Sequence, residues 1–460
     1  MPGRTDLVIF GASGDLARRK ILPALRGLDD GELRVIGAGR SDIQEEAFRK
    51  VVAETSGSEA LAATADWVQL DYAVPETYGR LKEELADDRS VIFYLATPPQ
   101  TFSSILQGLT ASGLSGKDGR DHRVVMEKPL GQDADSARRL NAQLAELFNE
   151  DQVYRIDHYL AKDTVQNVLA FRFSNSIFEP VWNRSAVQSI QITAAEEIGI
   201  EQRAGYYDRI GAVRDMVQNH VLQVLALVSM EPPATFDPVD IRRAKHELLR
   251  SVDPIRAEQA VRGQYEGYLQ EHGVDDDSRR ETYAAARLSI HNWRWDGVPI
   301  FIRTGKALRR QLTEVVIRWR DAPHLKVGGH LQRPIPTLLV MRFQPNEGIT
   351  LRIGAKRPGP RFEMVPAGMT LEYKRLARAP LPDAYENVLS EIMAGGHTAF
   401  PGGKEIERSW EIVDPLIQSW ESEGHPETYS KGSWGPQAAE DLVTSGGGGR
   451  WISSGDEPGT

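Results

Sequence analysis

Ionisable side chains are concentrated between Arg155 and Lys162, a segment that reads RIDHYLAK. If the segment is helical from Asp157 onward, His158 and Lys162 share one face of the helix. Tyr159, three residues before Lys162, then lies beside them. Imidazole, phenol and ammonium groups at a helix N-terminus suit a phosphate group. Asp157 points elsewhere and is available for another task, although it could also be the N-cap of a solvated helix start.

A second polar cluster precedes an apolar stretch, where RDMVQNH is followed by VLQVLALV. A lone histidine such as His220 at the start of this stretch is often a satisfied core residue. Asp215 and Asn219 nearby favour a functional site instead, with the imidazole as an acid or base. A third candidate is Lys128 in a Glu-Lys-Pro sequence after a buried strand, because a bend there directs a side chain to the carboxyl edge of a sheet.

The turn GASGDL, from Gly11 to Leu16, follows the first apolar strand of the chain. Glycines at a strand-to-helix turn allow backbone amides to approach a pyrophosphate, and the helix N-terminus adds partial positive charge. Ser13 and Leu16 stand where the G-x-G-x-x-G fingerprint has its second and third glycines. The alternative is therefore a plain tight turn, but its place at the first strand-helix junction favours a dinucleotide site.

Arg40 stands just after the second predicted strand. An acidic residue at this place holds the ribose hydroxyls of NAD, whereas a basic residue suits the 2′-phosphate of NADP. Arg40 could instead be a solvated surface residue, but its position favours a role in cofactor binding. The sequence therefore predicts NADP as the cofactor, with NAD possible.

Two patterns of secondary structure position these residues. Apolar runs alternate with helical segments up to about residue 155, which indicates an α/β, Rossmann-like, doubly wound parallel sheet. Beyond it, alternating strands and long helices indicate an α+β domain with a large, mostly antiparallel sheet. The predicted strands are 7–10, 34–39, 91–96, 124–126, 189–193, 287–295, 314–319 and 337–343; the helices are 16–28, 42–54, 216–228 and 241–249.

We therefore expect a dinucleotide-binding domain at residues 1–155 and a substrate and oligomerisation domain at 156–436. A glycine- and serine-rich, flexible tail is expected at 437–460. The chain of 460 residues carries a net charge of -10 without a basic patch, so nucleic acid is not an expected partner. With no cysteine, thiolate chemistry is excluded. No signal peptide or membrane span is visible, so a cytoplasmic location is expected.

The motifs GASGDLARRK, MEKPLG, YRIDHYLAKDTVQN, AEEIGIEQRAGYYD, RDMVQNH and RTGKAL together resemble those of the glucose-6-phosphate dehydrogenase family. The resemblance extends from the first strand to about Pro436, and RIDHYL followed by DMVQNH is its most specific part. It implies oxidation of glucose 6-phosphate at C1 with NADP, giving 6-phosphogluconolactone in the oxidative pentose phosphate pathway. It also implies a homodimer or homotetramer. We expect no membrane partner and no metal, because no membrane span and no metal-ligand spacing are visible in the sequence.

The resemblance implies a role for each matching residue. His220 would be the general base at the C1 hydroxyl, and Asp157 would orient it and stabilise its protonated form. The implied phosphate ligands are His158, Tyr159 and Lys162. The implied sugar ligands are Glu196, Asp215, Lys306 and Lys128, the last of which would also contact the cofactor. The implied cofactor site contains Gly11, Ser13, Gly14, Asp15, Leu16, Lys20 and Arg40.

The sequence departs from the family pattern at a few places, including Ala161 in place of a glycine and Gln311 in place of an arginine near the sugar. None removes a catalytic group. Two alternatives remain at this point. One is a dehydrogenase of a different sugar or sugar phosphate, which the cluster at 158–162 disfavours. The other is a non-catalytic paralogue, which the intact His220 and Asp157 disfavour.

Overall fold

The computed structural model describes residues 4–28, 31–86, 88–117, 119–201, 204–323, 325–327, 330–332, 334–376 and 383–454. The chain forms two units, each assembled from separate segments. Unit 1 contains Met1–Lys162, Pro233–Arg243 and Pro382–Glu407, and unit 2 contains the rest. The sequence predicts one boundary near residue 155, because it carries no signal that two later segments return to the first unit. Among the described residues, every helix is too short or too polar to span a bilayer.

Unit 1 is built on a six-stranded parallel sheet of order β3-β2-β1-β4-β5-β6. This is the strand order of a doubly wound dinucleotide-binding sheet, as predicted. Its apolar strands are buried because helices cover both faces. The strands are β1 (Thr5–Phe10), β2 (Leu33–Gly39), β3 (Asp66–Gln69), β4 (Ser90–Leu95), β5 (His122–Met126) and β6 (Val153–Arg155).

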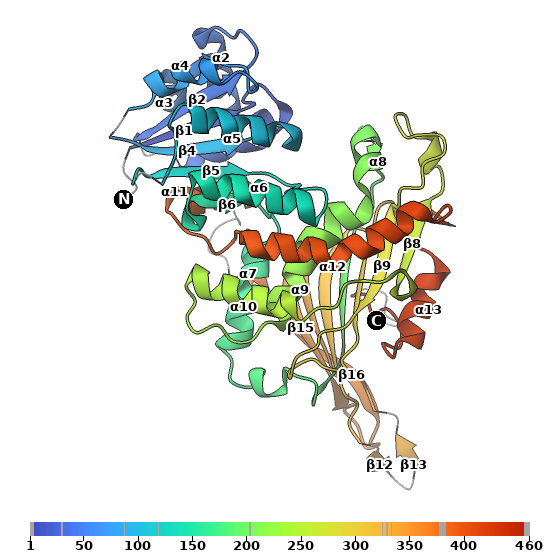
Figure 1. Ribbon diagram of the computed structural model, residues 1–460. Helices are drawn as coiled ribbons and strands as arrows, with labels where there is room; N and C mark the ends of the chain where they lie inside the picture. Colours follow the sequence, from blue (N-terminus) through green and yellow to red (C-terminus); the bar gives the residue numbers. More distant parts are fainter. Residues whose placement is uncertain are drawn as a thin grey trace. The chain divides into compact units, whose positions relative to one another are not determined.

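The helices of unit 1 include one from the C-terminal third of the chain. Figure 1 shows α11 (Ala384–Met393), in the red of the late chain, beside the sheet of the first 160 residues. Arg123 of β5 donates to the carbonyl of Ile392 at 2.6 Å, which anchors this helix. The π-helix η1 (Ala17–Ile21) continues into α1 (Leu22–Ala24) between β1 and β2. Longer helices between the strands are α2 (Glu45–Ser56), α3 (Glu59–Ala63), α4 (Tyr78–Glu84), α5 (Phe102–Ala111) and α6 (Ala134–Leu147).

Unit 2 is built on a nine-stranded sheet of order β16-β15-β14-β11-β7-β10-β9-β8-β17. Most neighbours are antiparallel, as predicted, but the β7–β10 and β8–β17 pairs are parallel. The strands are β7 (Val187–Ala195), β8 (Ala260–Tyr265), β9 (Tyr283–Leu288), β10 (Ile300–Gly305), β11 (Leu312–Trp319), β14 (Leu338–Gln344), β15 (Gly348–Lys356), β16 (Met364–Glu372) and β17 (Glu427–Tyr429). A separate hairpin contains β12 (Leu325–Val327) and β13 (His330–Gln332).

The predicted strand at 287–295 is wrong beyond Leu288, where β9 ends. The side chain of Asn292 accepts hydrogen bonds from the amides of Arg294 and Trp295, at 3.1 and 2.8 Å, and closes a turn. The predicted helices at 216–228 and 241–249 are confirmed. The helices outside the sheet of unit 1 are α7 (Asp163–Phe173), α8 (Ala204–Ala212), the π-helix η8 (Val213–Val221), α9 (Leu222–Ser229), α10 (Pro238–Arg250), α12 (Gly403–Ser422) and α13 (Gln437–Ser445).

Residues 437–454, which the sequence assigns to a flexible tail, contain α13 and a buried tryptophan. The indole of Trp451 donates to the carbonyl of Ala439 at 2.9 Å. The guanidinium of Arg303 lies over the rings of Trp434 and Trp451, at 4.5 and 4.4 Å from their centroids. Aromatic burial therefore fixes this segment despite its glycine content, and residues 455–460 of the predicted tail lie outside the described residues.

Candidate functional site

The glycine turn after β1 packs closely against the residues that follow β4. Gly11 has φ of 82°, and a Cβ there would lie 2.9 Å from Thr97 Cγ2 and 3.0 Å from the Ala96 carbonyl. Only glycine fits this position. The amide of Gly14 donates to the Gly11 carbonyl at 2.9 Å, which closes the turn. The side chains that follow are exposed at Ser13, Asp15 and Lys20 and partly exposed at Leu16.

Arg40 lines a cavity beyond the carboxyl ends of β2 and β3. The cavity has a volume of about 430 Å³ and is lined by Arg40, Gln69, Leu70, Asp71, Glu76, Thr77 and Arg80. Both arginines are exposed, and no described residue forms an ion pair with either guanidinium. Two guanidinium groups without an ion pair in one cavity suit a dianionic group such as the 2′-phosphate of NADP, and the same lining also contains the carboxylates of Asp71 and Glu76. Sequence reasoning missed Arg80 because it lies 40 residues beyond Arg40, on α4.

Lys128 lies two residues after the end of β5, and its peptide bond to Pro129 is cis. The carboxylate of its neighbour Glu127 accepts hydrogen bonds from Tyr94 at 2.7 Å and from Tyr385 at 3.2 Å. Burial raises the pKa of Glu127, while these two hydrogen bonds oppose the shift. The turn that presents Lys128 is therefore held from β4 on one side and α11 on the other.

Helix α11 also contacts the turn after β1. Lys20 lies 3.7 Å from the carboxylate of Asp383, which caps the N-terminus of α11 by accepting from the Tyr385 amide at 2.9 Å. The ammonium of Lys20 lies 5.9 Å from the ring centroid of Tyr385. The same helix therefore holds two predicted cofactor-binding segments, Lys20 and Lys128. No local pattern reveals this, because the contacts join segments more than 250 residues apart.

Residues 157–162 are brought together, but not by a helix. The segment forms turns, and α7 begins only at Asp163, so the predicted helical spacing is wrong. Asp157 explains the difference: its Oδ1 accepts from the amide of Tyr159 at 2.9 Å, which favours a turn. The ring of Tyr159 lies 5.2 Å from that of His158, and the Lys162 ammonium lies 5.0 Å from the Tyr159 centroid. These three side chains thus form the predicted cluster by another route.

Glu196, Lys306 and Asp215 converge in unit 2. Glu196 directly follows β7 and Lys306 directly follows β10, and these two strands are parallel neighbours. Their carboxyl ends therefore meet at one edge of the sheet. The Lys306 ammonium is paired with the Glu196 carboxylate and lies 3.5 Å from that of Asp215. Lys306 is 13% exposed, so this ion pair is largely shielded from water.

The helix that carries Asp215 and His220 begins at a kink that requires glycine. Gly211 has φ of 74°, and a Cβ there would lie 2.3 Å from the carboxylate of Glu281. Two amides at the start of η8 are satisfied by Glu281: Ala212 donates to its carbonyl and Val213 to its Oε1, both at 3.1 Å. Because the first amides of a helix lack partners inside it, this carboxylate fixes where η8 begins. His220 is 1% exposed and follows in the widened π-helical turns, which are frequent at functional sites.

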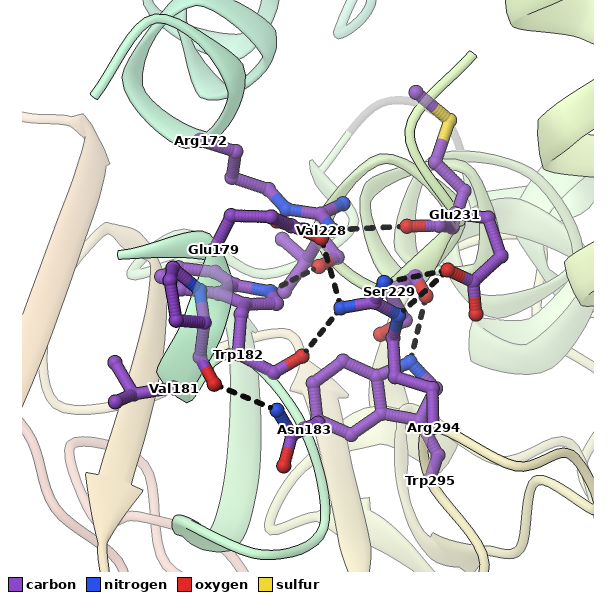
Figure 2. Close-up of polar contacts among 12 residues, drawn as sticks. Arg172, Glu179, Val181, Trp182, Asn183, Val228, Ser229, Glu231, Arg294 and Trp295 are labelled. Atoms are coloured by element: carbon purple, nitrogen blue, oxygen red, sulfur yellow. Dashed lines mark hydrogen bonds and ion pairs between the residues drawn. The ribbon is translucent and has the colours of Figure 1, made fainter. Parts of the chain in front are cut away.

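The far end of the same helix, at the C-terminus of α9, is held by three buried side chains (Figure 2). Arg172 donates to the carbonyls of Leu227 and Met230, both at 2.8 Å. The indoles of Trp182 and Trp295 donate to the carbonyls of Val228 at 2.8 Å and Ser229 at 2.6 Å. The last carbonyls of a helix also lack partners inside it, so these donors stabilise the end of the helix that carries His220.

Acidic and basic side chains surround this clamp, which consists of Arg172, Trp182 and Trp295. Glu179 lies 3.5 Å from Arg172 and 2.9 Å from Arg294, and Arg294 is paired in turn with Glu231 at 2.5 Å (Figure 2). Burial lowers the pKa of Arg172, and the Glu179 carboxylate opposes that shift. Sequence reasoning missed this clamp, since its residues come from four separate segments.

Each unit therefore gathers part of the predicted set. Unit 1 holds the glycine turn, Arg40, Lys128 and residues 157–162. Unit 2 holds Glu196, Asp215, Lys306 and His220. Among the described residues, His, Asp and Glu side chains form no group of three that could hold a metal ion.

Two family models together match nearly the whole chain. The model described as "Glucose-6-phosphate dehydrogenase, NAD binding domain" matches residues 8–167. The model described as "Glucose-6-phosphate dehydrogenase, C-terminal domain" matches residues 169–452. A parallel dinucleotide-binding sheet followed by a large mixed sheet is thus the arrangement of a two-part, nicotinamide-dependent dehydrogenase.

Individual relatives agree with this assignment. The glucose-6-phosphate 1-dehydrogenase of Treponema pallidum is 40% identical over 95% of this chain and 93% of its own length. A solved glucose-6-phosphate dehydrogenase in complex with its substrate has a TM-score of 0.89 and 34% identity, covering 98% of this chain and 99% of its own. The Mycobacterium avium enzyme has a TM-score of 0.86 and 35% identity, with 96% and 98% covered. The chain belongs to the glucose-6-phosphate dehydrogenase family.

Proposed function

We propose that this chain oxidises glucose 6-phosphate at C1 to 6-phosphogluconolactone, with NADP as the hydride acceptor. The observation that carries the proposal is the near-complete match, at a TM-score of 0.89, to a relative solved with glucose 6-phosphate. The residues implied by the sequence resemblance are all present. Support also comes from two groups of them: Glu196, Lys306 and Asp215 lie together in unit 2, and His158, Tyr159 and Lys162 lie together in unit 1.

The sugar is proposed to bind at two chemically distinct groups of residues. Its phosphate suits the cationic and aromatic cluster of His158, Tyr159 and Lys162. Its neutral hydroxyls suit Glu196, Lys306 and Asp215, because a shielded ammonium donates and two carboxylates accept hydrogen bonds. Binding energy from the phosphate, which is remote from C1, then fixes the reacting carbon.

Proton removal is assigned to His220, which would take the proton of the C1 hydroxyl as the hydride leaves. The carboxylate of Asp157 is the proposed partner that orients the imidazole and stabilises its charged form. The π-helical turns of η8 and the fixed ends of the η8–α9 helix hold the imidazole in one position. When bound, NADP supplies the acceptor for the hydride at its nicotinamide ring.

The cofactor preference is assigned to Arg40, with the backbone of Gly11 to Leu16 as the proposed pyrophosphate site. The open glycine turn and the cavity beside Arg40 both fit a dinucleotide that carries a 2′-phosphate. Lys128 and Lys20 complete the proposed cofactor site from the neighbouring turn and helix.

The test is nicotinamide reduction by the purified chain with glucose 6-phosphate, measured in parallel with NADP and NAD. Glucose serves as the substrate control, since it lacks the phosphate. We expect rapid reduction with NADP and glucose 6-phosphate, and a fall in kcat of about 10²- to 10⁴-fold in His220→Asn. Absence of reduction with either cofactor would contradict the proposal. Near-normal turnover in His220→Asn would contradict only the assignment of His220 as the general base.

We further propose a homodimer or homotetramer that associates through the nine-stranded sheet. Two side chains of β16 are unusually exposed for their type: Met369 at 56% and Leu371 at 39%. Exposed apolar side chains on one strand favour contact with another protein surface. Light scattering should give a mass of two or four chains, and Met369→Glu with Leu371→Glu should lower it. A monomeric native chain would contradict the assignment.

A further inference from the structure

Tyr207 is a buried tyrosine of α8 whose role the family resemblance does not define. Its side chain is 5% exposed, whereas that of its neighbour Tyr206 is 42% exposed. Tyr207 packs in the apolar cluster of unit 2 that also contains Tyr268 and Tyr283.

The hydroxyl of Tyr207 has no hydrogen-bond partner among the described residues. By contrast, Tyr268, which is also buried, donates to Asp208 at 2.7 Å. A buried hydroxyl without a partner costs free energy, so a native structure that retains one needs a reason. Tyr283 also lacks a partner, and this second case provides a reference.

The surroundings of the two tyrosines differ. The ammonium of Lys306 lies 5.3 Å from the ring centroid of Tyr207. The charges that act on the Tyr207 hydroxyl belong to Asp215, Glu281 and Glu196, whereas those that act on Tyr283 belong to Arg303 and Glu440. Tyr207 is therefore the one of the pair that lies at the Glu196–Lys306–Asp215 cluster.

The hydroxyl of Tyr207 is held in its neutral form. Burial, and then the negative charge of Asp215, Glu281 and Glu196, raises the pKa of Tyr207 well above its usual value. The O–H is therefore available as a donor throughout the neutral range. Lys306 is already paired with two carboxylates, so Tyr207 adds an uncommitted donor to a cluster in which the ammonium is already engaged.

We propose that the Tyr207 hydroxyl is a further substrate contact, donating a hydrogen bond to one hydroxyl of the sugar ring beside Lys306. This inference rests on the proposed oxidation of glucose 6-phosphate. A neutral donor suits a neutral sugar hydroxyl, which becomes its missing partner when substrate binds. The ammonium of Lys306 near the ring and the burial of the ring hold the phenol in place before the sugar binds. Binding therefore costs little side-chain entropy at Tyr207.

The test is Tyr207→Phe, which removes the hydroxyl and keeps the ring. We expect KM for glucose 6-phosphate to rise roughly 3- to 10-fold, with KM for NADP changed less than about 2-fold. The free protein should unfold at the same temperature or a higher one, because an unsatisfied buried group is lost. Tyr283→Phe is the matched control for that gain and should leave both KM values unchanged.

Tyr268→Phe is the opposite control, because its hydroxyl has a partner. It should lower the unfolding temperature and leave KM for glucose 6-phosphate unchanged. A Tyr207→Phe protein that behaves in this way would overturn the proposal, since its hydroxyl would then be a structural group bound to an internal water.

Deoxy sugars identify the contact. Wild type and Tyr207→Phe are compared with glucose 6-phosphates that lack the hydroxyl at C2, C3 or C4. For one of them the two proteins should give equal kcat/KM, because the partner of the lost hydroxyl is also gone. An equal effect of the substitution on every sugar would overturn the assignment. Wild-type turnover of glucose 6-phosphate is measured first, so failure of the general reaction is distinguished from failure of this contact.

Discussion

The two proposed ligand sites hold their cations in opposite ways. At the cavity beside β2, Arg40 and Arg80 are exposed, and neither guanidinium has an ion-pair partner among the described residues. At the edge of the nine-stranded sheet, Lys306 is shielded and paired with Glu196 and Asp215. One site keeps its positive charge available, and the other neutralises it internally.

The difference follows from the chemistry of the two ligands. A 2′-phosphate brings its own negative charge, so unpaired guanidinium groups bind it without losing an earlier partner. A sugar ring brings neutral hydroxyls, which need donors and acceptors in alternation rather than net charge. A shielded ammonium between two carboxylates supplies both, whereas a lone buried ammonium would be costly.

Among the changes that compare the two sites, the largest expected effect comes from removing the cation of the paired site. Lys306→Ala removes the ammonium that is paired with Glu196 and lies near Asp215, and with it a proposed donor to the sugar, so we expect kcat/KM for glucose 6-phosphate to fall by about 10²- to 10³-fold. KM for NADP should change less than about 3-fold. Steady-state kinetics with each substrate varied in turn measures both.

A second variant separates charge from shape at this site. Lys306→Met combined with Glu196→Gln should recover the unfolding temperature lost in Lys306→Ala, because both members of the Lys306–Glu196 ion pair are then neutral. It should not recover activity, since the donor for the sugar is still absent. Recovery of activity would contradict the assignment of Lys306 as a sugar ligand.

The next largest effect is expected at the unpaired site. Arg40→Ala should raise KM for NADP by about 10- to 100-fold and leave KM for NAD nearly unchanged, since only NADP carries the 2′-phosphate. The unfolding temperature should not fall, because no described partner is released. Arg80→Ala should act in the same direction by about 3-fold. An equal effect of Arg40→Ala on both cofactors would contradict the role of this cavity.

A smaller effect is expected from salt, which should weaken ligand binding at the exposed site more than at the shielded site. Exposed charges are screened at high ionic strength, whereas shielded pairs are screened much less. Raising the salt concentration from about 0.05 to about 0.5 M should therefore increase KM for NADP by roughly 3-fold more than KM for NAD. The difference should disappear in Arg40→Ala. A difference that persists in this variant would place the salt-sensitive contact elsewhere.

The sequence predicts the frame of both sites but not their electrostatic state. The strand-helix alternation and the glycine turn predict the parallel sheet and its dinucleotide edge, because these signals are local. The convergence of Glu196 and Lys306 depends on a parallel pairing of β7 and β10 within a largely antiparallel sheet. The contact of Tyr385 with Glu127 depends on the return of α11 to unit 1.

Whether a tyrosine hydroxyl is buried or exposed is even harder to predict from sequence. Tyr206 and Tyr207 are adjacent and identical in type, and only the packing of α8 exposes one and buries the other. Likewise, the motif residues at 157–162 are in the right order, yet their turn arises from a local hydrogen bond of Asp157 rather than from a helix.

The smallest expected effect concerns His397. Unlike the exposed Arg40 and the ion-paired Lys306, this basic side chain is buried in its uncharged form. His397 is stacked on Tyr154 with ring centroids 4.1 Å apart, and its Nε2 donates to the carbonyl of Asp151 at 2.6 Å. Burial and the nearby Arg242 lower the pKa of His397 to about 4, while the Asp151 contact opposes the shift.

The direction of the pH dependence follows from that lowered pKa. Between the ordinary histidine pKa of about 6.5 and the folded value, the unfolded chain binds a proton that the folded chain does not, so stability falls as pH decreases. His397→Phe keeps the stacked ring and removes the titrating group. The drop in unfolding temperature between about pH 7 and about pH 5 should therefore be smaller in the variant, by ~2 °C. An equal drop in both proteins would show that His397 already carries a proton in the fold, and the contrast with the paired Lys306 would then be lost.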